Sequence, residues 1–416
     1  MRSSPLRRAA LLALAVALAP TARGHAQPVR KDAAPADGVV PGVEVLLRDS
    51  LHLVRGKRVG LITNHSGRDR QGRSTIDLLA HAPGVRLTAL FALEHGIRGA
   101  IEAGGRVEST VDSATGVPIH SLYGASHVPT AAMLEDVDVL VYDIQDVGAR
   151  VYTYQWGAAI AADSSGKPFI VLDRPDPVRA DRVQGGVLDP KFKSYVGYFP
   201  VALRYGLTPG ELLRYLQGTG QIHAPSLTVV PMRNYRRSMW YGDTQLAWVN
   251  PSPNLRDEEA TAVYTGTVFF EGTNVTEGRG TDAPFKQVGA PWLGDAGAIA
   301  AELNAKRLPG VRFDSATATV AAGAAKYPGQ TIPVLRVHVT DRDAVDAPAV
   351  GVHMLRAIYA RHRTEFQWRP SIDRLAGSDR LRAAVERDGG IEALLPALER
   401  ESRAFEREAQ KYWIYR

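Results

Sequence analysis

The sequence predicts an α/β fold: a Rossmann-like, doubly wound and mostly parallel sheet, followed by a second, smaller α+β domain at the C-terminus. Short apolar runs alternate with helix-like segments, as they do in βαβ units. Four of these runs end directly in polar clusters, at residues 61–63, 90–93, 139–142 and 169–172. Such runs indicate buried parallel strands, and ligands of these sheets bind beyond the carboxyl ends of the strands. We therefore expect a functional site along that edge.

The first domain is expected over residues 41–254. Its strands are predicted at 57–63, 85–93, 137–144, 169–173 and 227–232, with a helix at 152–162. Ser74 is a typical N-terminal cap for a short helix, and Thr208 with Glu211 forms a capping box at the start of another. The glycine-rich residues 96–105 lack a helix pattern, which favours a functional loop beside Glu94.

The second domain is expected over residues 255–416. It begins with a loop at 271–281 that is rich in glycine, threonine and charged residues. Helices are predicted at 295–307, at 347–362 and from about residue 378, with a strand at 332–339.

Residues 1–26 have the pattern of a secretory signal peptide. Arg2, Arg7 and Arg8 precede an apolar run at 9–19, and cleavage is expected after Ala26. That run is too short to span a bilayer. We expect an exported protein, in the periplasm or outside the cell, without stable membrane insertion. Residues 27–40 are expected to form a disordered lead-in.

The charge balance argues against a nucleic-acid partner. The chain has 50 Lys and Arg against 44 Asp and Glu, and without the signal peptide the counts are 46 and 44. The remaining basic residues are dispersed rather than clustered. There is no cysteine, which excludes thiol catalysis and thiolate metal sites.

Several acidic residues are expected near the sheet edge. Glu94, Asp143, Asp146 and Asp173 follow strands, and Glu277 lies in the loop of the second domain. Glycoside hydrolysis uses two neighbouring carboxyl groups, one of them protonated. An aspartate at a strand end also commonly caps a helix or braces a loop, and this alternative stays open for Asp143 and Asp173.

Histidines and arginines lie in the same loops. His65 and His95 follow neighbouring strands and have either structural or ligand-binding roles, while a metal site with Asp146 is a competing interpretation without a recognised ligand spacing. The arginines are Arg98, Arg150, Arg174 and Arg279. Each can clamp a substrate carboxylate or form an internal salt bridge. Neither a P-loop nor a dinucleotide fingerprint follows a strand, so no nucleotide cofactor is expected.

Six strings occur in order over nearly the whole mature chain: EHGIRG at 94–99, DIQDVGAR at 143–150, LDRPDP at 172–177, PSPN at 251–254, EGTN at 271–274 and EGRGT at 277–281. Together they resemble the exo-β-N-acetylmuramidase (NamZ) family of bacterial peptidoglycan hydrolases. The resemblance implies release of N-acetylmuramic acid from the non-reducing end of peptidoglycan fragments. It also implies a cleft between two domains, no metal, and a catalytic role for the glutamate of the first string, Glu94.

We therefore expect a glycoside hydrolase of peptidoglycan-derived oligosaccharides, with Glu94 as general acid/base and Glu277 or Asp146 as the second carboxylate. The residues expected to contact the substrate are Asn64, His65, His95, Arg98, Asp143, Arg150, Tyr152, Asp173, Arg174, Asn254, Asn274 and Arg279. Two alternatives use the same edge: a non-catalytic muropeptide-binding protein and a metal-dependent hydrolase. No cofactor is expected, and nothing in the sequence indicates an oligomeric state.

Overall fold

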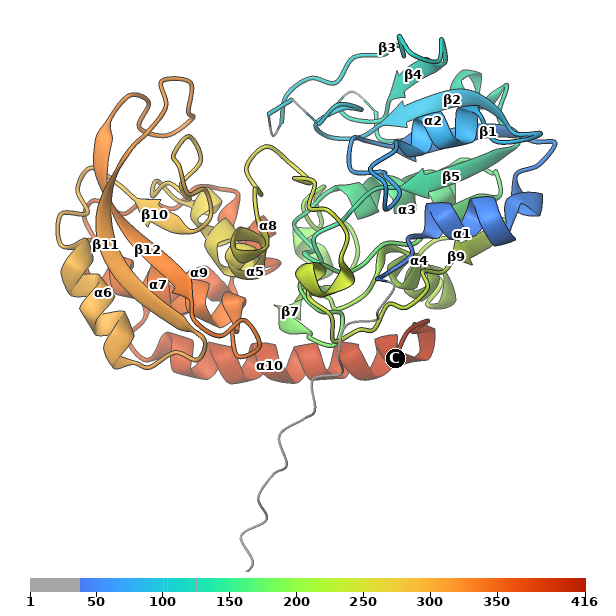
Figure 1. The fold of residues 1–416 in the computed structure, drawn as a ribbon. Coiled ribbons are helices and arrows are strands. Elements are labelled where there is room, and N and C mark those ends of the chain that lie inside the picture. The colour runs from blue at the N-terminus through green and yellow to red at the C-terminus, as the bar shows by residue number, and fades with distance from the viewer. Residues whose placement is uncertain (1–37, 100, 103, 125) are drawn as a thin grey trace, which may run out of the picture. The chain divides into compact units, whose positions relative to one another are not determined.

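The computed structural model describes residues 38–416 except 100, 103 and 125 (Figure 1). The predicted signal peptide, residues 1–26, and most of the predicted lead-in lie outside the described residues. For residues 38–40 the prediction of disorder is wrong, because Val39 and Val40 are buried and Val40 pairs with Arg233.

A mostly parallel sheet forms the first part of the fold (Figure 1). Within the described residues it has seven strands in the order β3 (Thr110–Val111), β4 (Pro118–Ser121), β2 (Arg86–Ala92), β1 (Arg58–Thr63), β5 (Val139–Asp143), β6 (Phe169–Leu172) and β9 (Leu227–Val230). All neighbours pair in parallel except β3 and β4. The five predicted strands correspond to β1, β2, β5, β6 and β9, and the predicted fold class is confirmed.

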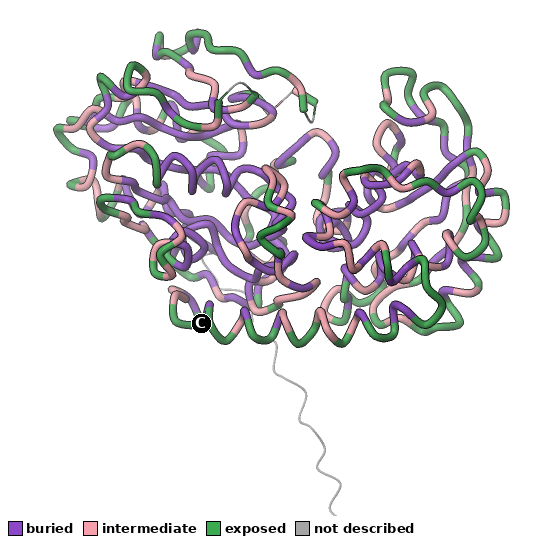
Figure 2. The backbone as a smooth tube through the Cα atoms, turned by 180° about the vertical axis from the view of Figure 1, so that it is seen from behind, coloured by how far each residue is buried: buried purple, intermediate pink, exposed green. Residues whose placement is uncertain are grey.

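Helices cover both faces of this sheet. They are α1 (Gly42–Asp49), α2 (Thr75–Ala80), α3 (Tyr154–Ser164) and α4 (Pro209–Gly218). Side chains alternate across a strand, so Val139 and Val141 of β5 pack with α1 and α2, while Leu140 and Tyr142 pack with α3 and α4. The sheet is therefore doubly wound. The buried positions in its strands form a continuous interior in Figure 2.

The predicted helix caps are present. The Ser74 hydroxyl accepts a hydrogen bond from the Ile76 amide at 3.2 Å. Thr208 and Glu211 make both bonds of the capping box at the start of α4. Helix α1 was not predicted from the sequence. It packs against β6 and β9. A Cβ atom on Gly42 would lie 2.4 Å from the Asp173 amide nitrogen, so this close approach requires glycine.

The second part has its own antiparallel sheet, in the order β10 (Gln287–Gly289), β12 (Thr331–Val339) and β11 (Val311–Thr319). Its helices are α5 (Glu258–Thr267), α6 (Ala296–Ala305), α7 (Ala347–Arg361), α8 (Ile372–Ala376), α9 (Arg380–Glu386) and α10 (Gly390–Ala409). The predicted helices at 295–307 and 347–362 correspond to α6 and α7, and the predicted strand corresponds to β12. Strand β11 was missed because few of its side chains are apolar and buried.

The remaining elements are short. A two-stranded sheet joins β7 (Gln184–Val187) to β8 (Ala202–Arg204), and α10 packs against β7. The 3-10 helices are η1 (Leu51–Leu53), η2 (Ala132–Leu134), η3 (Pro190–Phe192), η4 (Tyr241–Thr244), η5 (Val268–Gly272) and η6 (Gln410–Tyr412). No helix among the described residues combines the length and apolar composition needed to cross a bilayer. The domain boundary at residue 254 stays a prediction.

Candidate active site

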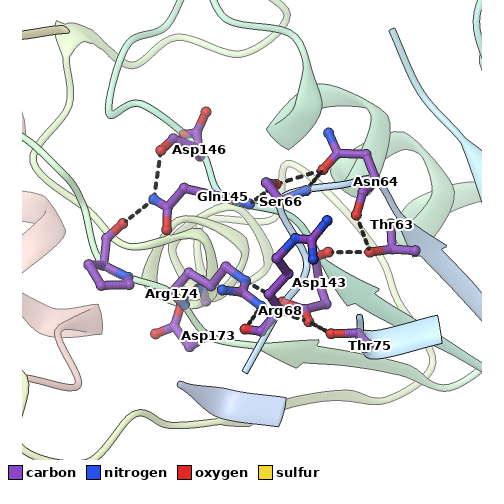
Figure 3. Close-up of polar contacts among 12 residues, drawn as sticks. Thr63, Asn64, Ser66, Arg68, Thr75, Asp143, Gln145, Asp146, Asp173 and Arg174 are labelled. Carbon is purple, nitrogen blue, oxygen red and sulfur yellow. Dashed lines mark hydrogen bonds and ion pairs between the residues drawn. The ribbon is translucent and has the colours of Figure 1, made fainter. Parts of the chain in front are cut away.

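The carboxyl ends of β1, β5 and β6 hold a buried polar network (Figure 3). Asp143 is the last residue of β5 and accepts hydrogen bonds from the Arg174 guanidinium, one of them at 2.9 Å, and from the Thr75 hydroxyl. Burial alone would lower the pKa of Arg174, but the charge of Asp143 outweighs it and the pKa is raised. The internal salt bridge is therefore the correct alternative for this pair, and the expected substrate contacts at Asp143 and Arg174 do not fit their placement.

Asp173 braces the start of α4. Its carboxylate accepts hydrogen bonds from the Gly210 amide and the Thr208 hydroxyl, each at 2.8 Å, and from the Tyr415 hydroxyl at 2.7 Å. Burial raises the pKa of Asp173 to about 7. The side chain is completely buried, so the bracing alternative holds and a substrate contact at Asp173 does not fit.

Asp146, which we expected to be a candidate second carboxylate, is also enclosed by protein. Its Oδ2 atom accepts a hydrogen bond from the Tyr205 hydroxyl, and its Oδ1 atom has no partner among the described residues. Burial raises the pKa of Asp146 to about 8. It lines neither of the cavities described below, so this expectation is not supported by the geometry.

Two further arginines, Arg98 and Arg150, have partners within the protein. Arg150 is fully buried and donates to the carbonyl oxygens of Val201 at 3.3 Å and Leu375 at 3.0 Å, the latter at the end of α8. Burial lowers the pKa of Arg150 to about 9. Arg98 pairs with the buried Asp112 at 2.9 Å. Neither lines the two cavities described below, so these cavities give no support to the expected substrate contacts at Arg98 and Arg150.

The polar residues Asn64, His65 and Asn274 each have a structural partner within the protein. Asn64 Oδ1 accepts from the Ser66 amide at 2.9 Å, and His65 Nε2 donates to the Asn250 carbonyl oxygen at 2.7 Å. Burial lowers the pKa of His65. Asn274 donates to the Glu365 carbonyl oxygen at 2.7 Å. None of the three lines the cavities near Glu94.

Glu94, unlike the residues described so far, lines a cavity. It follows β2 in a loop and is only half-buried. Its Oε1 atom accepts hydrogen bonds from the Tyr123 hydroxyl at 2.8 Å and the Gly104 amide at 3.1 Å, and its Oε2 atom accepts one from the Thr153 hydroxyl at 2.5 Å. His95 next to it adopts a positive φ of 67°, an uncommon conformation outside glycine. The carboxylate is thus held firmly beside a cavity.

The cavity beside Glu94 is small, with a volume of about 80 Å³. Its polar lining comes from both parts of the fold: Glu94, His95, Tyr152, Thr153, Tyr154, Ser252, Asn254, Tyr264, Glu271 and Arg279. Burial raises the pKa of Tyr264, and the charges of Glu271 and Glu94 add to the effect. Two carboxyl groups from distant segments therefore face one space.

A larger cavity of about 730 Å³ adjoins the small one, because Asn254, Glu271 and Arg279 line both. This volume lies in the range of small-molecule sites, whereas the small cavity is far below that range. A ligand that reaches Glu94 must therefore occupy the larger cavity with most of its atoms. The larger cavity is also lined by Glu102, Arg256, Glu277, Lys326 and Arg369.

Arg279 joins two carboxyl groups. Its Nη1 atom donates to Glu271 at 2.5 Å and to Glu277 at 3.0 Å, and the guanidinium lies over the Phe285 ring, 4.8 Å from its centre. Lys326 Nζ binds the other oxygen of Glu277 at 2.8 Å. Burial raises the pKa of Glu271, whereas the charges of Lys326 and Arg279 overcome burial and lower that of Glu277. The pKa values of these two neighbouring glutamates are thus shifted in opposite directions.

The described residues contain no group of three or more His, Asp or Glu side chains arranged to hold a metal ion. The competing metal interpretation combined His65, His95 and Asp146. His65 and Asp146 have the separate partners given above, and His95 Nδ1 donates to the Ile101 carbonyl oxygen.

Two family models together match most of the chain. Residues 59–259 match the family model "Exo-beta-N-acetylmuramidase NamZ, N-terminal", and residues 262–415 match "Exo-beta-N-acetylmuramidase NamZ, C-terminal". The chain belongs to the NamZ family. It is also 40% identical over 382 residues, 91% of each chain, to the peptidoglycan beta-N-acetylmuramidase NamZ of Bacillus subtilis (strain 168).

Two solved structures are similar to the chain, both DUF1343 family proteins from Bacteroides fragilis NCTC 9343. BF0371 has a TM-score of 0.85 and 32% identity, covering 92% of this chain and all of its own. BF0379 has a TM-score of 0.72 and 28% identity, covering 91% of this chain and 99% of its own. These likenesses support the two-sheet architecture.

Both NamZ regions contribute to the cavity at Glu94. Sequence reasoning placed Glu94, His95, Tyr152, Asn254 and Arg279 in the site, and the structure brings these together. It missed Glu271, which begins the EGTN string and lies in η5, because its local pattern resembles that of Glu277. It also missed Thr153 and Lys326. No sequence signal marks Lys326, which reaches Glu277 from a loop between β11 and β12.

Proposed function

We propose that this protein is an exo-acting β-N-acetylmuramidase that releases N-acetylmuramic acid from the non-reducing end of peptidoglycan fragments during cell-wall turnover. The observation that carries the proposal is the shared cavity of Glu94 and Glu271, in a chain that belongs to the NamZ family. The name of the Bacillus subtilis relative, a peptidoglycan beta-N-acetylmuramidase, supports the same activity.

Glu271 suits the role of proton donor to the leaving oxygen. One of its oxygens is bound to Arg279, and the other has no hydrogen-bond partner among the described residues. Burial raises the pKa of Glu271, and a raised pKa favours the protonated carboxyl group that general acid catalysis requires. Glu277, which is itself bound by Lys326, accepts a hydrogen bond from Arg279 and thereby helps to position Glu271.

Glu94 suits the role of the second carboxylate. Its two oxygens accept three hydrogen bonds, from Tyr123, Gly104 and Thr153, which fix a carboxylate against the cavity. Such a group stabilises the positive charge that develops on the sugar, or attacks the anomeric carbon, or activates water there. This division differs from our expectation that Glu94 itself donates the proton.

The proposal is tested with a chromogenic N-acetylmuraminide. The protein should release the chromophore, and Glu94→Gln should lower kcat about 100-fold to 10,000-fold with an unchanged melting temperature. Glu108→Gln is the control, because Glu108 is exposed and lines neither cavity. A chelator should leave the rate unchanged; loss of activity with chelator, or binding without hydrolysis, would favour the two alternatives.

We also propose that the protein is exported, with cleavage after Ala26. The basic start and the apolar run at residues 9–19 support this. N-terminal sequencing of the protein recovered outside the cytoplasm should begin at Gln27, and a chain that keeps residues 1–26 would contradict export.

A further inference from the structure

The larger cavity contains more cationic than acidic side chains. Its lining includes four cationic residues, Arg256, Arg279, Lys326 and Arg369, and three acidic residues, Glu102, Glu271 and Glu277. Arg279 and Lys326 are already engaged by Glu271 and Glu277. The third carboxylate, Glu102, accepts a hydrogen bond from the Asn254 amide at 3.1 Å. The other two cationic residues of the lining are Arg256 and Arg369.

Arg256 has only backbone acceptors. Its Nε atom lies 3.3 Å from the Pro253 carbonyl oxygen, and its Nη1 atom lies 3.5 Å from that of Thr281. These long contacts hold the guanidinium at the cavity without neutralising it. Arg256 forms no ion pair with any acidic residue that the structure describes.

Arg369 is anchored through its backbone. Its amide donates to the Gly272 carbonyl oxygen at 2.8 Å, next to Glu271. Burial lowers the pKa of Lys326, and the charge of Arg369 lowers it further, so the two cations lie close enough to repel each other. The Arg369 guanidinium likewise has no acidic partner within the described part of the chain. A guanidinium that lies near a second cation and has no acidic partner of its own favours an anionic ligand.

The chemistry of the proposed substrate provides such an anion. An arginine binds a carboxylate through two parallel hydrogen bonds. N-acetylmuramic acid differs from N-acetylglucosamine by a lactyl ether on ring carbon 3, which ends in a carboxylate. When a stem peptide is attached, that carboxylate becomes an amide, and the peptide supplies a carboxylate of its own.

We propose that Arg256 and Arg369 bind a substrate carboxylate in the larger cavity and thereby select muramoyl over glucosaminyl sugars. The proposal rests on the muramidase function above. The reacting bond lies at Glu94 and Glu271, and the charged substituent of the same sugar extends into the larger cavity, which shares Glu271 with the small one. Arg279 stays with its two glutamates and does not serve as the anion clamp.

The test compares two inhibitors of chromophore release, N-acetylmuramic acid and its methyl ester, which keeps the sugar but removes the charge. The protein should bind the acid at least about tenfold more tightly than the ester. Arg256→Gln and Arg369→Gln together should bring the two inhibition constants within about twofold and raise KM for the chromogenic N-acetylmuraminide roughly tenfold or more, with little change in kcat. Arg400→Gln on α10, exposed and outside both cavities, is the control.

A substrate that carries L-alanyl-D-isoglutamine on the lactyl group distinguishes the two sources of carboxylate. If the double variant loses affinity for it too, the peptide carboxylate is bound; if only the unsubstituted sugar is affected, the lactyl carboxylate is bound. A double variant that still prefers the acid over the ester would overturn the proposal while leaving the muramidase activity intact. Failure of the unaltered protein to release the chromophore would instead overturn the proposed function itself.

Discussion

Tyr123 donates a hydrogen bond of 2.8 Å to Glu94, and the Tyr123 ring lies 5.8 Å from the ring of Tyr195. The aromatic contacts thus help to fix a hydroxyl group on the carboxylate that faces the cavity. Burial raises the pKa of Tyr123 well above its ordinary value, and Glu94 adds to the effect, so the hydroxyl keeps its proton and remains a donor.

Tyr123→Phe should therefore lower kcat about tenfold to a hundredfold, because Glu94 loses one of its positioning donors. Tyr195→Phe is the matched control, since the Tyr195 hydroxyl is buried and has no hydrogen-bond partner among the described residues. Steady-state kinetics on the chromogenic N-acetylmuraminide measures both variants. Equal rates for Tyr123→Phe and the unaltered protein would show that this bond does not support catalysis.

Glu271 and Glu277 should respond differently to the same substitution. Glu271→Gln should reduce kcat about 100-fold or more, because it removes the proton donor, and should change stability little. Glu277→Gln should instead destabilise the fold by about 2–5 kcal/mol, because it leaves Lys326 buried beside a neutral side chain. Kinetics and urea unfolding of both variants check this, and a catalytic defect confined to Glu277→Gln would restore Glu277 as the second carboxylate.

The ion pair between Arg174 and Asp143 should contribute to stability rather than to catalysis. Arg174→Met leaves Asp143 buried without its cation and should cost about 3–5 kcal/mol in the free energy of unfolding. Arg403→Met, which breaks an exposed pair with Glu399, should cost less than about 1 kcal/mol. Urea unfolding monitored by circular dichroism gives both values. Similar costs would mean that the buried pair adds nothing beyond a surface pair.

Stability should fall as pH rises from 5 to 8. The pKa of Asp146 is raised from 3.8 to about 8, and burial raises that of Asp173 to about 7. In this window the folded protein keeps protons that the unfolded chain has released, so rising pH favours unfolding. Asp146→Asn should make the dependence of melting temperature on pH shallower.

The control for this pH effect is Asp138→Asn. Hydrogen bonds from Arg58 lower the pKa of Asp138 to about 2, so it stays ionised throughout the window. Its substitution should move the whole stability curve without changing the slope between pH 5 and 8. An unchanged slope for Asp146→Asn would mean that this carboxyl group is ionised in the folded protein.

The strands were predictable because a buried parallel strand needs a short apolar run, and β1, β2, β5 and β6 each have one. The helix caps were predictable because they depend on residues close in sequence. The partners of the residues at the strand ends were not predictable from the sequence. Asp173 and Glu94 both follow apolar runs, yet the chain folds Tyr415 onto Asp173 and leaves Glu94 beside a cavity. Contacts between distant residues decide which carboxylate is structural.

Contacts between distant residues also explain why the role of Glu271 was not predictable from the sequence. Nothing in its local pattern distinguishes it from Glu277, which lies six residues later in a similar glycine-rich string. Lys326 makes the difference, because it neutralises Glu277 and leaves Glu271 with a single cationic partner. The composition of the loops indicated the right region but could not assign the two roles.

The hydrogen bond between Tyr415 and Asp173 joins residues 242 positions apart. A ribosome therefore finishes β6 long before it makes the side chain that completes the surroundings of Asp173. The first domain therefore completes its packing around Asp173 only after the second domain has been made, because that packing depends on Tyr415.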